Sequence, residues 1–120
     1  MSVEENVEIK IFLAEDDEDD RLLFREAMNE VNNGIKVIEC HDGVHLLENL
    51  QECQVQSEDL IFLDLNMPLM NGFECLDKIK KDPHWRKVRT IIFSTTAEDD
   101  YVEKSFQKGA FMYIKKPNSF

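Results

Sequence analysis

The sequence contains few of the residues that cross-link a chain or interrupt its regular structure. Its 120 residues include only three cysteines, four glycines, three prolines and one tryptophan. Cys40, Cys53 and Cys75 are odd in number and widely spaced, which argues against a disulfide framework and indicates reduced thiols in a cytoplasmic protein. Repeats, low-complexity tracts and linkers are also absent, so we expect a single domain over residues 1–120.

Long apolar segments are missing too. No apolar run approaches the roughly 20 residues that a helix needs to cross a bilayer, so we expect no membrane partner. The start, MSVEENVEIK, has three glutamates and no apolar signal core, which argues against secretion. With 42% hydrophobic and 32% charged residues, the composition is that of a globular protein rather than a disordered one.

Positive charge is scarce. The chain has 14 lysines and arginines against 25 aspartates and glutamates, a net charge of −11. Phosphate backbones repel such a surface, so we expect no direct binding of nucleic acid. Acidic surfaces attract divalent cations and basic partner faces, and most of the carboxylates are expected to be solvated.

Apolar runs alternate with amphipathic runs along the chain. Short apolar runs predict strands, whereas apolar residues at steps of three or four predict helices. The run 60–65 (LIFLDL) is typical of a central parallel strand covered on both faces. In chain order, we expect strands at 9–14, 36–40, 60–65, 88–94 and 111–115, and helices at 19–31, from Gly43 with Val44, Leu47 and Leu50 on one face, from Phe73 to the break at Asp82-Pro83, and at 98–108.

This alternation predicts an α/β fold with a doubly wound parallel sheet and right-handed crossovers. The sequence stops at Phe120, where the pattern requires a fifth helix. We therefore expect the C-terminal helix to be truncated, and one face of the sheet near the first and fifth strands to be bare.

Reactive side chains follow the predicted strands at their carboxyl ends, where functional groups of open α/β sheets gather. Crowded carboxylates stay ionised at neutral pH only if a cation neutralises them, and Mg²⁺ prefers such oxygen ligands. An aspartate can attack phosphorus to give an acyl phosphate, whose oxygens then need a metal, a lysine and a hydroxyl. The candidate groups are Glu15-Asp16-Asp17, Asp64, Ser94-Thr95-Thr96 and Lys115-Lys116. Among them, Asp64 fits the attacking carboxylate, Lys116 the lysine and Thr95 the hydroxyl.

In this order and spacing, the motifs resemble the receiver domain of bacterial response regulators over essentially the whole length. The phrase DLNMPLMNGFE is similar to the stand-alone, phytochrome-associated type. The resemblance implies a chemotaxis-regulator-like, flavodoxin-like five-stranded sheet with strand order 2-1-3-4-5. The matching residues are Glu15-Asp16, Asp64 to Pro68, Asn71-Gly72, Thr95, Gly109-Ala110, Tyr113 and Lys116-Pro117.

The resemblance also implies a role for each matching residue. Asp64 would accept a phosphoryl group from a sensor histidine kinase or a phosphotransfer protein. Mg²⁺ would be bound by Asp16, Asp64 and the backbone carbonyl of Asn66, with Glu15 acting through water. Lys116 would form a salt bridge with Asp64 or its phosphate, and the bond between Lys116 and Pro117 would be cis. Thr95 would contact the phosphate, and Tyr113 would swing inward.

The resemblance also implies that a downstream protein binds to the fourth helix and the fifth strand. A second copy of the chain, in a homodimer, is a further partner left open.

Several alternatives stay open. Ser94 and Thr96 compete with Thr95 for the hydroxyl role, and Lys115 competes with Lys116. Glu15 and Asp16 are also placed to cap the first helix, although Asp17 and Asp19 are better placed for that. A haloacid-dehalogenase-like aspartyl phosphatase shares the phospho-aspartate chemistry, but it needs an acid where this chain has Asn66. A docking module that is never phosphorylated is the other rival, although such modules usually lose a residue that this chain keeps.

Overall fold

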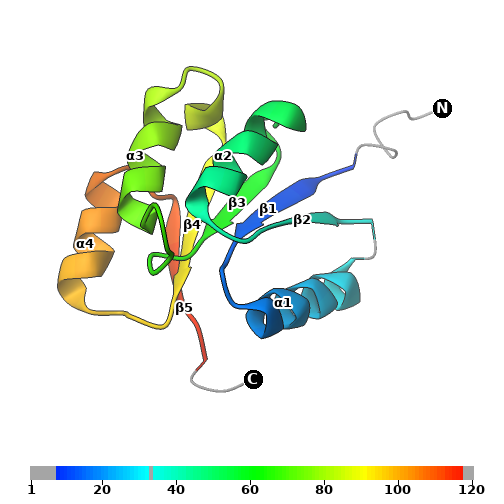
Figure 1. Ribbon diagram of the computed structural model, residues 1–120, viewed down its shortest axis with the longest axis horizontal. Helices are drawn as coiled ribbons and strands as arrows, with labels where there is room; N and C mark the ends of the chain where they lie inside the picture. The colour runs from blue at the N-terminus through cyan, green and yellow to red at the C-terminus, as the bar shows by residue number, and fades with distance from the viewer. Residues whose placement is uncertain (1–7, 33, 118–120) are drawn as a thin grey trace.

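The computed structural model describes residues 8–32 and 34–117. A five-stranded sheet with the order β2-β1-β3-β4-β5 lies at its centre (Figure 1), and each neighbouring pair is parallel. The predicted doubly wound fold and strand order are therefore confirmed. The strands are β1 (Lys10–Ala14), β2 (Lys36–Cys40), β3 (Leu60–Leu63), β4 (Arg89–Ser94) and β5 (Met112–Lys115); the helices are α1 (Glu18–Val31), α2 (Gly43–Glu52), α3 (Gly72–Lys81) and α4 (Asp99–Gln107), with a 3₁₀ turn η2 (Trp85–Lys87).

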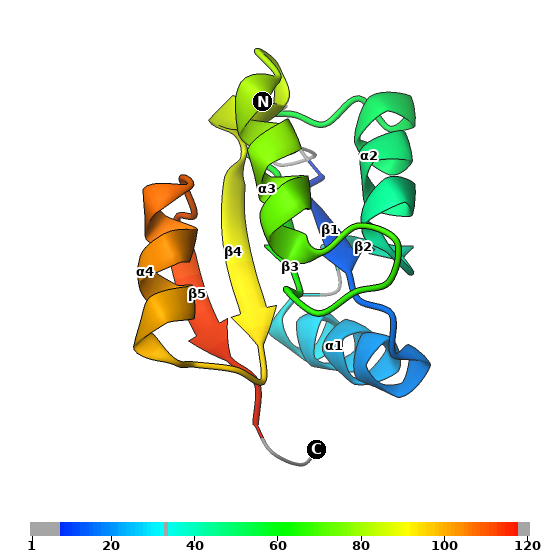
Figure 2. The same ribbon diagram turned by 60° about the vertical axis from the view of Figure 1, so that its left-hand side comes forward.

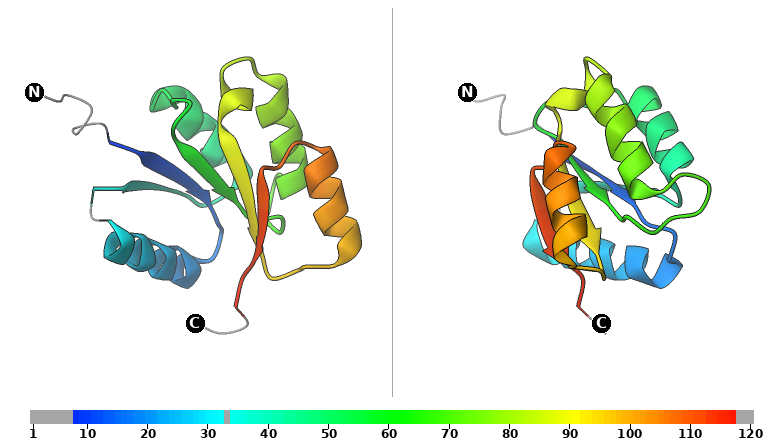
Figure 3. Two further views of the ribbon diagram at one scale, coloured as in Figure 1. Left: turned by 180° about the vertical axis from the view of Figure 1, so that it is seen from behind. Right: turned by 90° about the vertical axis from the view of Figure 1, so that its left-hand side faces the viewer.

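The helices cover the sheet unequally. α1 lies on one face, and α2, α3 and α4 lie on the other (Figures 2 and 3). Side chains of a strand alternate between the two faces of a sheet, so each face has its own core. The larger core lies beneath α2 and α3. Its fully buried members include Phe12, Leu46, Ile61, Leu63, Leu76, Ile79 and Ile92.

The opposite face has a smaller core and an uncovered area. Ile11 and Leu13 of β1 are buried against Phe24 of α1. Beside α1, a hollow of about 520 Å³ runs along β3, β4 and β5. A bare region on this face was expected, but it lies by β3 to β5, because α1 covers β1. The residues that line it include Leu23, Phe62, Phe93 and Ile114.

Polar side chains fix where the helices begin. The side chain of Asp17 accepts a hydrogen bond from the N–H of Asp20, so Asp17 is the N-cap of α1, as the alternative reading of this acid predicted. At α3, Asn71 and Glu74 form a reciprocal capping box. The buried face of α2 is different from the expected one, because Val44 is 42% exposed.

Two glycines make turns that a side chain would obstruct. Gly109 follows α4 with φ of 100°, a conformation that glycine adopts readily. A Cβ on Gly72 would lie 2.5 Å from the carbonyl oxygen of Asp64 and 2.6 Å from the Cα of Leu65. Gly72 therefore lets the start of α3 pack against the backbone next to Asp64.

The cysteines and the helices of the described part of the chain can be compared with the composition. All three cysteines are free thiols there, with Cys40 and Cys75 buried. None of its helices combines the length and apolar character that crossing a membrane requires.

Candidate functional site

The side chain of Lys116 lies at the centre of the carboxyl edge of the sheet. Its ammonium nitrogen is 3.2 Å from Oδ2 of Asp64 and also forms a salt bridge with Oε1 of Glu15. The lysine is only 3% exposed. Acids that follow the first and third strands therefore meet the lysine that follows the fifth, whereas Lys115 is exposed.

Three carboxylates gather around this lysine. Glu15, Asp16 and Asp64 each place an oxygen within 4.8 Å of the others. Glu15 and Asp64 are buried, and Asp16 is exposed at the mouth of the cluster. Hard oxygen ligands at this spacing fit Mg²⁺ or Mn²⁺, with the exposed side left for water or a phosphate. Lys116 alone does not balance three negative charges, so the cluster favours a divalent cation.

Burial makes the ionisation of Glu15 costly. Burial, reinforced by the charge of Asp64, raises the pKa of Glu15 to about 7, although Lys116 opposes this rise. Burial also lowers the pKa of Lys116, but hydrogen bonds and charges from Glu15 and Asp64 outweigh it and raise the pKa overall. Lys116 is therefore a permanent cation at neutral pH, and Glu15 is the acid poised to exchange its proton for a metal.

The loop after β3 positions Asp64. The strand ends at Leu63, one residue before Asp64, rather than at Leu65 as expected. The N–H of Asp64 donates to the carbonyl of Ala14 at 3.1 Å, which ties the acid to the end of β1. Oδ1 of Asp64 accepts the N–H of Asn66 at 3.2 Å, so each carboxylate oxygen of Asp64 has one partner.

The candidate hydroxyl residues at the end of β4 differ in burial. Ser94 is fully buried at the last position of β4, whereas Thr95 is exposed. The carbonyl of Ser94 accepts the N–H of Lys116 at 2.8 Å. The backbone of Ser94 is therefore joined to the segment that carries the lysine, and the phosphate contact predicted for Thr95 stays a prediction, with Ser94 and Thr96 as its alternatives.

Tyr113 lies beside these residues. Its hydroxyl donates to the backbone carbonyl of Thr96, and its ring packs against the main core. Burial raises the pKa of Tyr113. The tyrosine thus connects β5 to the loop that begins α4.

Two contacts of the site were not predicted. Asp20 lies with Oδ2 3.4 Å from the Lys116 ammonium, so a third carboxylate faces the lysine. Arg21 donates to the backbone carbonyl of Glu15 at 2.7 Å and holds the loop after β1. Their spacing of one helical turn from Asp16 and Asp17 was the available signal, but both lie in a run of charges that looked like a solvated helix start.

The bond between Lys116 and Pro117 is trans, since no cis peptide bond occurs in the described ranges. The expectation of a cis bond was wrong.

A family model for the response regulator receiver domain matches residues 11–120. The chain belongs to this family. Receiver domains are signalling modules of two-component systems that take phosphoryl groups from histidine kinases or phosphotransfer proteins, and they bind Mg²⁺ or Mn²⁺ at an acidic pocket.

Individual relatives agree with this assignment. Response regulator Rcp1 of Synechocystis is 31% identical over 121 residues, which cover 97% of this receiver domain and 82% of Rcp1. The crystal structure of the phosphorylated cyanobacterial phytochrome response regulator RcpA superposes with a TM-score of 0.85 at 31% identity, covering 94% of this chain and 84% of RcpA. The Mn²⁺-bound form of Rcp1 superposes with a TM-score of 0.84 at 27% identity, covering 93% and 84%. The predicted likeness to phytochrome response regulators is thus confirmed.

Other relatives are longer. A response regulatory protein of Yersinia pestis is 31% identical over 91% of this chain, which spans 42% of that protein. The chain spans 10% of protein RcaC of Microchaete diplosiphon.

Proposed function

We propose that Asp64 accepts a phosphoryl group and that the resulting charge switches a protein-binding surface of this receiver domain. The observation that carries the proposal is the contact of the Lys116 ammonium with Asp64 at 3.2 Å beside two further carboxylates. If one of those acids carries a phosphoryl group, the buried lysine can bind the charge of that group.

The transfer step follows from the groups present. A carboxylate oxygen of Asp64 attacks the phosphorus of a phosphohistidine, so that a P–O bond forms while the P–N bond breaks. The electron pair of the broken bond stays on the imidazole nitrogen, which takes a proton from water. Lys116 then shifts from the carboxylate of Asp64 to an oxygen of the phosphoryl group, which carries about −1.5 to −2 charges at neutral pH.

Mg²⁺ is the proposed metal. Asp16, Asp64 and the backbone carbonyl of Asn66 would hold it, with Glu15 acting through water. When bound, the ion neutralises negative charge on the phosphoryl oxygens. The proton on Glu15 leaves as the ion binds, because a cation favours the charged form of this acid.

The switch would pass through the hydroxyl at the end of β4. The prediction from sequence gives this role to Thr95, and the burial of Ser94 supports Ser94 instead. Either residue is followed by the loop to which Tyr113 is hydrogen-bonded. An inward movement of Tyr113 would alter the surface formed by α4 and β5, which we propose as the contact surface for a downstream protein.

Treatment with acetyl phosphate and Mg²⁺ tests the acceptor. We expect intact mass spectra to show one added phosphoryl group, mapped to Asp64, and no addition in Asp64→Asn. Asp77→Asn, which changes a surface acid paired with Lys108, is the matched control and should be labelled normally. Labelling of Asp64→Asn at the wild-type level would refute the acceptor assignment.

The same preparation separates the remaining alternatives. Sustained multiple turnover of a simple phosphate ester would support an aspartyl phosphatase, and complete failure to be labelled would support a docking module. Ser94→Ala should slow phosphoryl uptake more than Thr95→Ala; the opposite order would restore Thr95 to the hydroxyl role.

A further inference from the structure

The positive charges of this acidic chain are concentrated in one short segment. Residues 78–89 hold six of the 14 lysines and arginines but only one of the 25 acids, Asp82. The segment therefore carries a net charge of +5, and the rest of the chain carries −16. We call this segment, which runs from the end of α3 through η2 to the start of β4, the basic segment.

The basic side chains make few contacts inside the fold, one of which is the Arg89 guanidinium over the ring of Phe111 at 5.2 Å. Within the described residues, none of the six forms a salt bridge with an acid. Lys80 is the partly buried exception, donating to the carbonyls of Arg86 and Val88. The other five are exposed: Lys78, Lys81, Arg86, Lys87 and Arg89. Charges that a protein does not pair internally are available to a partner of opposite sign.

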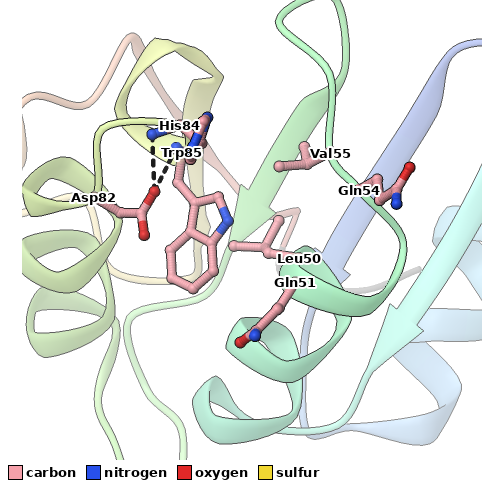
Figure 4. A pocket seen from close by; sticks show the side chains of 7 residues that line it. All are labelled: Leu50, Gln51, Gln54, Val55, Asp82, His84 and Trp85. Carbon is pink, nitrogen blue, oxygen red and sulfur yellow. Dashed lines mark hydrogen bonds between the residues drawn. The ribbon is translucent and has the colours of Figure 1, made fainter.

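A pocket opens next to the basic segment. It has a volume of about 450 Å³ and lies between the end of α2 and η2. Leu50 and Val55 point toward the indole of Trp85 across it (Figure 4), so its floor is apolar. Gln51 and Gln54 also line the pocket, on the same side as Leu50 and Val55, and the amide of Gln51 can pair with peptide groups (Figure 4).

The position of Trp85 is fixed by Asp82. Oδ1 of Asp82 accepts the N–H of His84 at 2.8 Å and that of Trp85 at 3.0 Å (Figure 4). The aspartate thus holds the backbone of the turn that carries the indole, and Trp85 also packs against the main core. Preformed aromatic pockets of this kind are frequent binding hot spots.

The acidic site is too far away to cancel this surface. Asp64 and Lys116 lie beyond the carboxyl ends of the strands, whereas the basic segment leads into the amino end of β4. The six residues of β4 separate them by about 16 Å. That distance exceeds the screening length of about 8 Å at physiological ionic strength.

We propose that the basic segment and the pocket around Trp85 bind an acidic peptide segment of a partner protein. An apolar or aromatic side chain of the peptide enters the pocket, and flanking carboxylates pair with the exposed lysines and arginines. A nucleic acid fits less well, because a long polyanion also meets the −16 charge of the remaining chain. This surface is separate from α4 and β5, so its use does not depend on the proposed phosphorylation.

The chain carries its own reporter for this site, since Trp85 is its single tryptophan. The probe is a short synthetic peptide with one phenylalanine flanked by glutamates. We expect the peptide to change the fluorescence of Trp85 in a saturable way at low salt, and a peptide with serine in place of phenylalanine to bind more weakly. Binding should be the same for Asp64→Asn, which separates this test from that of the acceptor.

Charge-reversal variants locate the contact. Lys81→Glu and Lys87→Glu should each weaken binding about fivefold, as loss of an exposed ion pair and its replacement by repulsion would do. Lys36→Glu makes the same change in net charge at the exposed first position of β2 and should stay within about twofold of wild type. Equal effects of Lys36→Glu and Lys87→Glu, absence of any saturable binding, or equally tight binding of a single-stranded oligonucleotide would each overturn the proposal.

Discussion

Replacing Glu15 by glutamine tests the electrostatics of the site directly. Burial raises the pKa of Glu15 from its ordinary value of 4.5 to about 7 in the folded chain. A folded acid with a raised pKa binds its proton more tightly than the unfolded chain does. The free energy of unfolding therefore falls as the pH rises from 4.5 to about 7 and stays low above that range.

The size of this loss follows from the shift. Each pKa unit corresponds to about 1.36 kcal/mol, so the rise from 4.5 to about 7 amounts to about 3.4 kcal/mol. Glutamine cannot ionise, but its amide oxygen can still accept the hydrogen bond from Lys116. Lys116 does not disturb the comparison, because its pKa is raised above 10.5 and it stays charged throughout this range. Most of this loss falls between about pH 5 and pH 8, so we expect Glu15→Gln to gain about 2.5 kcal/mol relative to wild type over that range in EDTA.

Urea unfolding at both pH values, followed by the fluorescence of Trp85, measures this difference. Glu48→Gln, at an exposed position of α2, is the matched control and should follow the wild-type pH dependence. Millimolar Mg²⁺ should restore stability to wild type above pH 7, since the ion binds the folded pocket only. Parallel pH dependences of wild type and Glu15→Gln would refute the reasoning, because they would show that burial does not raise the pKa of Glu15.

Three further substitutions have definite expected outcomes in chemical denaturation. Asp64→Asn should raise the metal-free stability at neutral pH by about 1 kcal/mol, because one of the repelling charges is removed; a loss would show that its salt bridge with Lys116 dominates. Gly72→Ala should cost about 2 kcal/mol, because its Cβ would lie 2.5 Å from the carbonyl oxygen of Asp64, whereas Gly34→Ala, which meets only a side chain, should cost much less. Thr90→Val should gain about 1 kcal/mol, because the buried Thr90 hydroxyl has no hydrogen-bond partner within the described chain; a loss would mean that the hydroxyl is satisfied.

The fold was predictable because its signals are local. A nearly unbroken apolar run predicted β3, and glycine after α4 marked the end of that helix. Alternation of the two kinds of run then left a doubly wound sheet as the natural arrangement. The convergence of acids and lysine followed from topology alone, since parallel strands end at the same edge of a sheet.

The details that stay open or were missed depend on a single residue of register or on long side chains. β4 ends at Ser94 as predicted, but successive strand residues face opposite sides, so the strand pattern alone does not decide between Ser94 and Thr95 for the hydroxyl role. Asp20 was missed for a different reason. The lysine reaches from the end of β5 to the first turn of α1, and the spacing of Asp20 from Asp16, the available signal, lies within a run of charges that looked solvated.

The position of Lys116 suggests how the pocket can act as a switch under the proposed function. The lysine faces Glu15, Asp20 and Asp64 together, so its charge is shared among three acids. A phosphoryl group on Asp64 competes for the same ammonium with a larger charge than any of them. The backbone of Lys116 is bonded to Ser94, so the lysine side chain can change partner while its strand stays fixed to β4. Under the same proposal, the bond between Tyr113 and Thr96 is the contact that would rearrange, since it joins β5 to the loop that leads into α4.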